Sequence, residues 1–184
     1  MSVQTRAQLQ ASSATIANET VAAANTASRV GGLFDDLADT ATLDRERGFA
    51  NLYIDTDTSF APTQGQRVKL TSTMRSGVLS TYNFSRTTNS LTYTGTTNAA
   101  LRIAASIVLS QDNNSQIKVY IAKNGTPIDQ SMTDITTSHN NGHAIYTEAY
   151  VTGAVNDEFT IYINAIDSGA SITISALSFT IHTL

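Results

Sequence analysis

The sequence predicts an all-β protein, an antiparallel sandwich preceded by a short helical N-terminal segment. From residue 49 onward, apolar and polar residues alternate with a period of two, which is typical of half-buried strands. Turn signals rich in Asn, Asp and Gly separate these runs, and no helical pattern lies between them, which favours a sandwich over a parallel α/β sheet. Before residue 48 the chain is instead rich in alanine. We therefore expect a helical segment over residues 1–45 and a head domain over residues 49–184.

The N-terminal segment carries apolar residues at helical spacing. The stripe follows i, i+3, i+4, i+7 and consists of Val30, Leu33, Phe34 and Leu37. We expect two short helices, over residues 4–17 and 27–40, with the stripe acting as a docking helix. Gly31 and Gly32 each cost such a helix roughly 1 kcal/mol, so it needs a partner surface. The alternative interpretation is a flexible tail.

The head domain divides into runs of alternating hydrophobicity. In chain order they cover residues 66–73, 101–109, 117–122, 145–151, 159–165 and 172–181. The last run changes parity, because Ile174 and Ala176 are followed by Leu177 and Phe179. A change of parity inside one strand predicts a β-bulge near residues 175–177. Asn124 and Gly125 predict the tip of a tight hairpin.

Tyrosine recurs on the second face of several strands, where a solvated sheet would carry threonine or charged residues. The tyrosines concerned are Tyr120, Tyr146, Tyr150 and Tyr162. Tyrosine combines an apolar ring with a polar tip and is enriched at protein interfaces. We therefore interpret these rings as a subunit contact near a three-fold axis. The alternative is the ordinary β-propensity of tyrosine.

Composition excludes several classes of partner. Charged residues make up 14% of the chain, against a usual share of about a quarter, and the net charge is -4. No run of like charges is present, so we expect no contact with nucleic acid. No stretch approaches the roughly 20 apolar residues of a membrane span, so we expect no membrane insertion. The start lacks the apolar core of a signal peptide, which predicts synthesis in a cytoplasm without standard export.

Motifs for catalysis or metal binding are absent from the sequence. His139 and His143 are four residues apart, but they lie in a loop by composition and have no third ligand at a usual spacing. Asp55 and Asp57 lack the glycine and the bidentate acid of a calcium loop. There is no cysteine and no nucleophile elbow or phosphate-binding loop. We therefore expect no enzymatic activity, no metal and no cofactor.

Several stretches together resemble the head domains of bacteriophage fibres and receptor-binding proteins. They are SLTYTG at residues 90–95, the strand at 99–109, and IKVYIAKNGT at 117–126. Such heads look like the trimeric jelly roll of the complement- and tumour-necrosis-factor-like superfamily. Residues 153–163 and 171–181 resemble the closing two strands of that fold. RVGGLFDDLAD, at residues 29–39, resembles a short helix near the start of many phage structural proteins.

The resemblance implies a jelly-roll sandwich and a homotrimeric virion protein, a fibre, spike or head-fibre subunit. It implies that residues 1–45 attach the subunit to other virion proteins, and that polar loops meet a host glycan or protein. Loops at 111–115 and 137–143 are the candidates for that contact, since binding residues concentrate on loops held by a rigid scaffold. The candidate residues are Asp112, Asn113, Asn114, His139, Asn140 and Asn141. The chain lacks a collagen-like stalk and a long shaft, which favours a small fibre, spike or decoration protein.

Two other functions fit the same pattern. One is a cellular recognition module, such as a bacterial surface or spore protein or a lectin. The other is a purely architectural capsid decoration protein without a host ligand. Location on virions favours the virion fibre or spike protein. Location in an envelope or spore coat favours the cellular recognition module.

Overall fold

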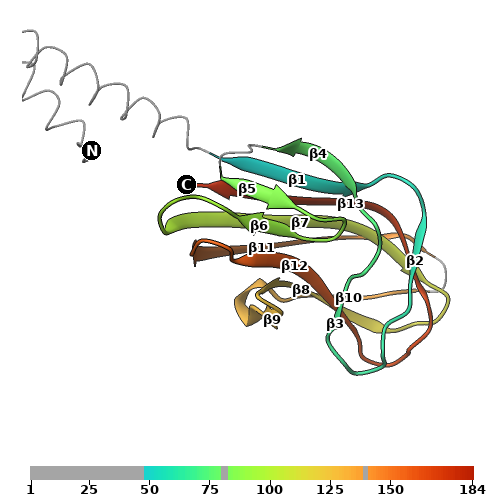
Figure 1. Ribbon diagram of the computed structural model, residues 1–184. Coiled ribbons are helices and arrows are strands. Elements are labelled where there is room, and N and C mark those ends of the chain that lie inside the picture. The colour runs from blue at the N-terminus through green and yellow to red at the C-terminus, as the bar shows by residue number, and fades with distance from the viewer. Residues whose placement is uncertain (1–47, 80–82, 139–140) are drawn as a thin grey trace, which may run out of the picture. The chain divides into compact units, whose positions relative to one another are not determined.

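The computed structural model describes residues 48–79, 83–138 and 141–184 (Figure 1). Residues Gly48–Leu184 form one compact unit. The predicted helices and the stripe of Val30, Leu33, Phe34 and Leu37 lie outside the described residues. The boundary between residues 45 and 49 therefore stays a prediction. Among the described residues, no helix has the length and hydrophobicity needed to cross a membrane.

The described part of the chain is built almost entirely of strands. The first half contains β1 (Phe49–Ile54), β2 (Thr58–Phe60), β3 (Val68–Lys69), β4 (Arg75–Leu79), β5 (Phe84–Arg86), β6 (Leu91–Tyr93) and β7 (Ala99–Gln111). The second half contains β8 (Gln116–Lys123), β9 (Thr126–Pro127), the 3-10 helix η1 (Asp129–Ser131), β10 (Thr133–Thr136), β11 (His143–Gly153), β12 (Glu158–Ala165) and β13 (Ile172–Thr183).

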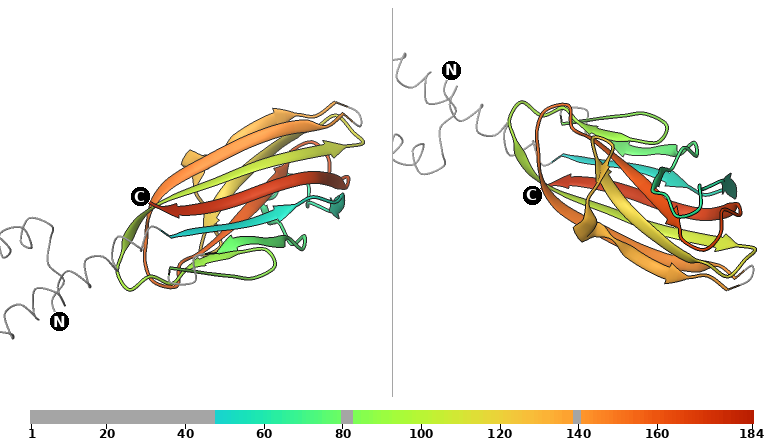
Figure 2. Two further views of the ribbon diagram at one scale, coloured as in Figure 1. Left: turned by 90° about the horizontal axis from the view of Figure 1, so that it is seen from above. Right: turned by 90° about the horizontal axis from the view of Figure 1, so that it is seen from below.

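The strands form two antiparallel sheets. Sheet A has the order β11-β7-β13-β1-β4, with β2 beside β13. The view from above in Figure 2 shows these five strands side by side. Sheet B has the order β10-β8-β12-β6-β5, with β3 beside β12 and β9 beside β8. The predicted all-β antiparallel sandwich is therefore confirmed.

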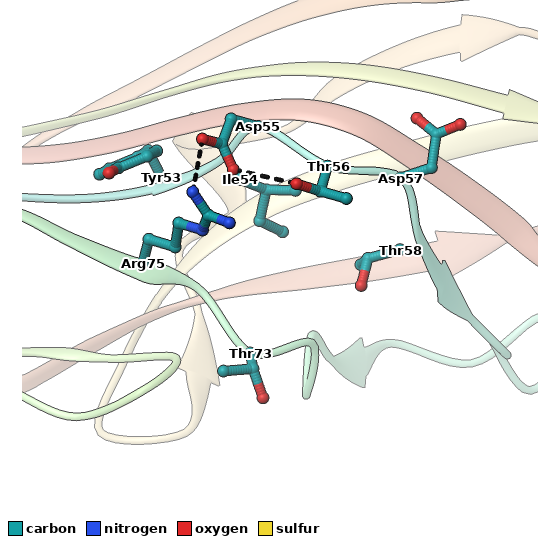
Figure 3. Close-up of a pocket in the computed structure, with 8 residues that line it drawn as sticks. All are labelled: Tyr53, Ile54, Asp55, Thr56, Asp57, Thr58, Thr73 and Arg75. Atoms are coloured by element: carbon teal, nitrogen blue, oxygen red, sulfur yellow. Dashed lines mark hydrogen bonds and ion pairs between the residues drawn. The ribbon is translucent and has the colours of Figure 1, made fainter.

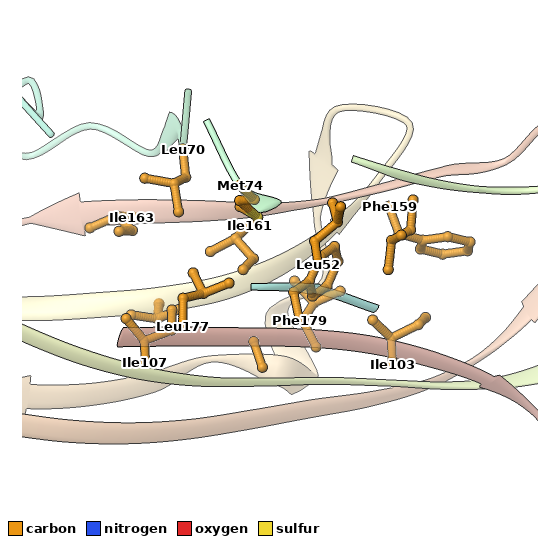
Figure 4. Packing of buried hydrophobic residues seen from close by; sticks show 14 of the residues in the cluster. Leu52, Leu70, Met74, Ile103, Ile107, Phe159, Ile161, Ile163, Leu177 and Phe179 are labelled. Atoms are coloured by element: carbon orange, nitrogen blue, oxygen red, sulfur yellow. The ribbon is translucent and has the colours of Figure 1, made fainter. Parts of the chain in front are cut away.

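The hydrophobic core lies between the two sheets. Each long strand turns alternate residues inward, and these residues are fully buried. Figure 4 shows the packing of the largest of them, among them Leu52, Ile103, Ile107, Phe159, Ile161, Ile163, Leu177 and Phe179. Because side chains alternate with a period of two, the same strands turn their other residues away from the core. The predicted run at 66–73 contains only the short strand β3, whereas the other five runs lie within β7, β8, β11, β12 and β13.

The parity change in β13 is a β-bulge, as predicted. The register of β13 against β7 shifts between Ile174 and Ala176. Ser175 and Ala176 are both exposed, while Ile174 and Leu177 are buried. The extra residue thus keeps both halves of the strand directed into the core.

The predicted hairpin tip between β8 and β9 is also confirmed. Asn124 has a φ of 51° and Gly125 a φ of 78°. Two successive residues with positive φ are what a type I′ turn requires, and asparagine followed by glycine adopts this conformation most easily.

The sandwich has two distinct ends. Phe49 pairs with His182, and Thr183 N donates a 3.1 Å hydrogen bond to Gly48 O, so the start of β1 and the end of β13 lie together. We call this the proximal end. At the opposite, distal end lie residues 112–115, 137–138, 141–142 and 166–171, since Ile172 pairs with Gln111.

The core predicts a sharp contrast between two substitutions in sheet A. Phe179→Ala removes a fully buried ring and should cost about 3–5 kcal/mol of unfolding free energy. Val78→Ala, at a side chain that is 68% exposed on β4, should change it by less than about 0.5 kcal/mol. Urea unfolding followed by circular dichroism measures both. Equal effects would contradict the assignment of the core.

Candidate functional site

The outward side of sheet A forms an ordered surface across β11, β7, β13 and β1. The register places its residues in three rows, which we call the sheet A face. The rows are Tyr146–Ser106–Ser178–Tyr53, Glu148–Ala104–Thr180–Asn51 and Tyr150–Arg102–His182–Phe49. Each row therefore crosses the sheet at right angles to the strands, as pairing in an antiparallel sheet requires.

Large rings lie at the margins of the sheet A face, and in its first two rows short side chains lie in the middle. On the β11 side, Tyr146 is 51% exposed and Tyr150 is 62% exposed. The middle strands contribute Ala104, Ser106 and Ser178, which are too short to cover the neighbouring rings. The sheet A face therefore exposes aromatic rings next to a strip of short side chains.

One cluster of three side chains supplies most of the charge on this face. Arg102 Nη2 lies 3.0 Å from Glu148 Oε2 and donates a 2.8 Å hydrogen bond to Tyr146 Oη. Tyr146 Oη in turn donates a 2.8 Å hydrogen bond to Glu148 Oε2. The hydrogen bond from the Tyr146 hydroxyl, and next the one from Arg102, lower the pKa of Glu148. The hydrogen bond that Tyr146 donates to the Glu148 carboxylate raises the pKa of Tyr146. The cluster is thus mutually hydrogen-bonded and carries no net charge.

His182 completes the face on β13. Its ring centroid lies 4.6 Å from that of Phe49, with the planes tilted by 50°. Burial lowers the pKa of His182, and the positive charge of Arg102 lowers it further. The structure therefore favours the neutral form of this imidazole.

The other two predicted interface tyrosines lie on the opposite sheet. Tyr120 on β8 pairs with Tyr162 on β12, and both belong to sheet B. Tyr120 is only 4% exposed, and the Arg67 guanidinium lies 4.5 Å above its ring. The four tyrosines therefore lie on two different sheets, because β11 belongs to sheet A and the β8–β12 pair to sheet B, and their role in a subunit contact stays a prediction. Alternation alone does not distinguish the outward sides of two sheets.

The outward side of sheet B differs in charge from the sheet A face. The charged residues that the register places on this outward side lie on four of its strands: Lys69, Lys118, Asp134 and Glu158. By contrast, none of the exposed large apolar side chains of the described residues lies on a sheet B strand. They are Val78, Met132, Tyr146, Tyr150, Val155 and Leu184. Exposed apolar area therefore gathers on sheet A and near the sandwich ends.

The distal loops contain four of the predicted receptor residues. Asp112, Asn113, Asn114 and Asn141 are exposed there, whereas His139 and Asn140 lie outside the described residues. The two predicted loops meet, because the buried Thr137 donates to Asn113 O at 3.1 Å and accepts from Ser115 N at 3.0 Å. Asn113 Nδ2 also donates to Ser168 Oγ at 3.4 Å. The exposed Asn side chains therefore lie on loops that these hydrogen bonds join to one another.

A small cavity of about 200 Å³ lies beside the connection of β1 and β2 (Figure 3). Its lining is mainly polar and includes Thr56, Thr58 and Thr73. Arg75 Nη1 spans one side and donates to Asp55 Oδ2 at 3.0 Å. Within the described ranges no three His, Cys, Asp or Glu residues cluster as metal ligands would. The cavity is smaller than the roughly 300 Å³ at which pockets for drug-sized ligands begin.

The sequence missed several residues of the sheet A face. Arg102 and Glu148 occupy the outward parity of the runs at 101–109 and 145–151, so their shared face could have been inferred once β11 was paired with β7. Phe49, Tyr53 and His182 gave no comparable signal, because their grouping depends on the pairing of β1 with β13.

Comparison with solved structures identifies a known fold. The crystal structure of murine APRIL at pH 5.0, a TNF-family jelly-roll protein, matches with a TM-score of 0.52 and 9% identity, covering 76% of this chain and 100% of that chain. The structure of murine APRIL at pH 8.0 matches with a TM-score of 0.50 and 7% identity, covering 74% and 99%. The fold is therefore a TNF-like jelly roll, and identities this low show the fold alone.

Comparisons of sequence find nothing similar. No protein-family model matches the chain, and no curated protein matches it. The resemblance to bacteriophage fibre heads stays a prediction.

The cluster on the sheet A face predicts a measurable titration. The pKa of the Glu148 carboxyl should lie below its ordinary value, and Tyr146→Phe should raise it because the hydroxyl donor is lost. Carbon-13 NMR of the labelled side chain through an acid titration measures both values. Tyr150→Phe serves as the control, since no hydrogen bond joins Tyr150 to Glu148. An unchanged Glu148 pKa in Tyr146→Phe would contradict the hydrogen-bonded cluster.

Proposed function

We propose that this protein is a self-associating TNF-like jelly-roll protein whose subunits meet through the sheet A face, and that it serves as a homotrimeric fibre or spike subunit of a virion. Its role in this proposal is assembly and binding without catalysis. The observation that carries it is the contrast between the two outward surfaces. The outward side of sheet B carries charged side chains. The sheet A face instead exposes Tyr146 and Tyr150 beside the ion pair of Arg102 and Glu148, whose charges cancel.

Covering the sheet A face removes aromatic area from water. Two tyrosines that are each more than half exposed would contribute favourably at roughly 25 cal/mol per Å² of apolar area buried. The usual obstacle is the cost of burying charge. Here that cost is reduced, because Arg102 and Glu148 already satisfy each other and share the Tyr146 hydroxyl.

The layout of the face favours a head-to-tail contact. The exposed rings lie on the β11 side, whereas Ala104, Ser106 and Ser178 form the low middle strip. Rings from one copy can pack on the middle strip of the next, so each subunit offers one surface and receives the other. Contacts of this kind close into rings when the rotation permits it. The resemblance to trimeric jelly-roll heads supports a ring of three.

The two ends of the sandwich support separate roles. The chain enters the domain at the proximal end, where Gly48 lies, and the N-terminal segment is proposed to attach there to other virion proteins. The distal end presents Asn113, Asn114 and Asn141, whose amides suit hydroxyl-rich ligands such as a host glycan. Three copies on one particle would convert weak single contacts into avid binding.

Removal of the two exposed rings should dissociate the subunits. Tyr146→Ser combined with Tyr150→Ser removes the aromatic margin of the sheet A face and should reduce the mass in analytical ultracentrifugation to that of one subunit. Tyr162→Ser removes the same ring type from sheet B and should leave the assembly unchanged. Thermal unfolding confirms that each variant folds. An unaltered mass in the double variant would refute association through this face.

The virion role has its own test. Mass spectrometry of purified particles from the source should detect the chain, and a glycan array should record binding by the full chain. Asn113→Ala with Asn141→Ala should weaken that binding at least tenfold without changing the oligomer. Detection in an envelope or spore coat would instead favour the cellular recognition module. Presence on virions without any glycan binding or cell adsorption would favour an architectural decoration protein.

A further inference from the structure

We infer that protonation of His182 separates the subunits, so that the assembly is sensitive to mildly acidic pH. This inference rests on the proposed association through the sheet A face. Its starting point is the place of the imidazole in the third row, between Arg102 on β7 and Phe49 on β1. His182 is therefore covered whenever that row is covered.

The contacts of His182 leave a positive charge poorly compensated. One side of the ring meets the Phe49 ring, with the centroids 4.6 Å apart. Arg102 is the row neighbour on the other side; its guanidinium bonds Glu148 and Tyr146, and its positive charge acts on His182. The nearest carboxylate on the face, Glu148, is already engaged by Arg102 and by the Tyr146 hydroxyl. A charged imidazole would thus lie beside a second cation.

The two partners of Arg102 keep their charge state between pH 5 and 8. Glu148 stays ionised there, because its hydrogen bonds lower its pKa. Tyr146 stays neutral, because its pKa is raised. Tyr53 on β1 and Tyr150 on β11 are the other two tyrosines of the face. Arg75 on the neighbouring β4 is an arginine and keeps its charge.

The sign of the effect follows from linkage. The pKa of His182 is already lowered in the single subunit, by burial and by Arg102. A neighbouring copy removes the remaining water and lowers the pKa further. The assembly therefore binds fewer protons than the separated subunits. Association is strongest above the pKa that His182 has in the separated subunit. It weakens as pH falls below that value, by roughly tenfold per pH unit for each buried His182 until the pKa in the assembly is reached.

The test uses the full chain in sedimentation velocity at pH 8.0 and pH 5.5, with circular dichroism to confirm folding at both. The wild type should be assembled at pH 8.0 and measurably more dissociated at pH 5.5. His182→Gln should remain assembled at both values, because the side chain can no longer take up a proton. His182→Lys should be dissociated already at pH 8.0. His139→Gln with His143→Gln should behave like the wild type, because it removes the chain's other two histidines.

The outcomes separate this inference from the function on which it rests. A wild type that is equally assembled at both pH values overturns the role of His182 but leaves association through the sheet A face intact. Loss of assembly at pH 5.5 in His182→Gln likewise overturns it. A wild type that sediments as one subunit at pH 8.0 overturns both proposals.

Discussion

Every long strand of the described sandwich has two sides, and only the inward side belongs to the hydrophobic core. The core takes the inward residues of both sheets, from Leu52 on β1 to Phe179 on β13. The outward residues differ in chemistry between the two sheets. Sheet B carries lysine, arginine and acidic side chains, and Arg67 covers the one tyrosine on β8. The sheet A face has few charges and leaves the rings of Tyr146 and Tyr150 exposed.

The arrangement on the sheet A face links packing to electrostatics. Arg102, Glu148 and Tyr146 satisfy one another within a single subunit, which lets a largely apolar contact include charged groups. The same arginine disfavours a second positive charge on His182. In the proposed assembly, Arg102 would therefore both neutralise Glu148 at the contact and oppose protonation of His182.

Alternation and turn signals were sufficient to predict the class of fold, the bulge in β13 and the hairpin at Asn124. They were not sufficient to assign strands to layers, because both sheets alternate with the same period. Tyr120 and Tyr146 looked equivalent for that reason, and only the pairing of β8 with β12 and of β11 with β7 separates them. His182 and Phe49 are 133 residues apart, so no local pattern could join them.

The meeting of Gly48 and Thr183 at the proximal end also bears on how the domain can be re-engineered. Gly48 N and O both hydrogen-bond to Thr183, at 2.7 and 3.1 Å. A short linker could join these neighbouring ends, and the chain could be reopened in a distal connection. Such a circular permutant would keep every strand pairing while changing the order in which the strands are synthesised.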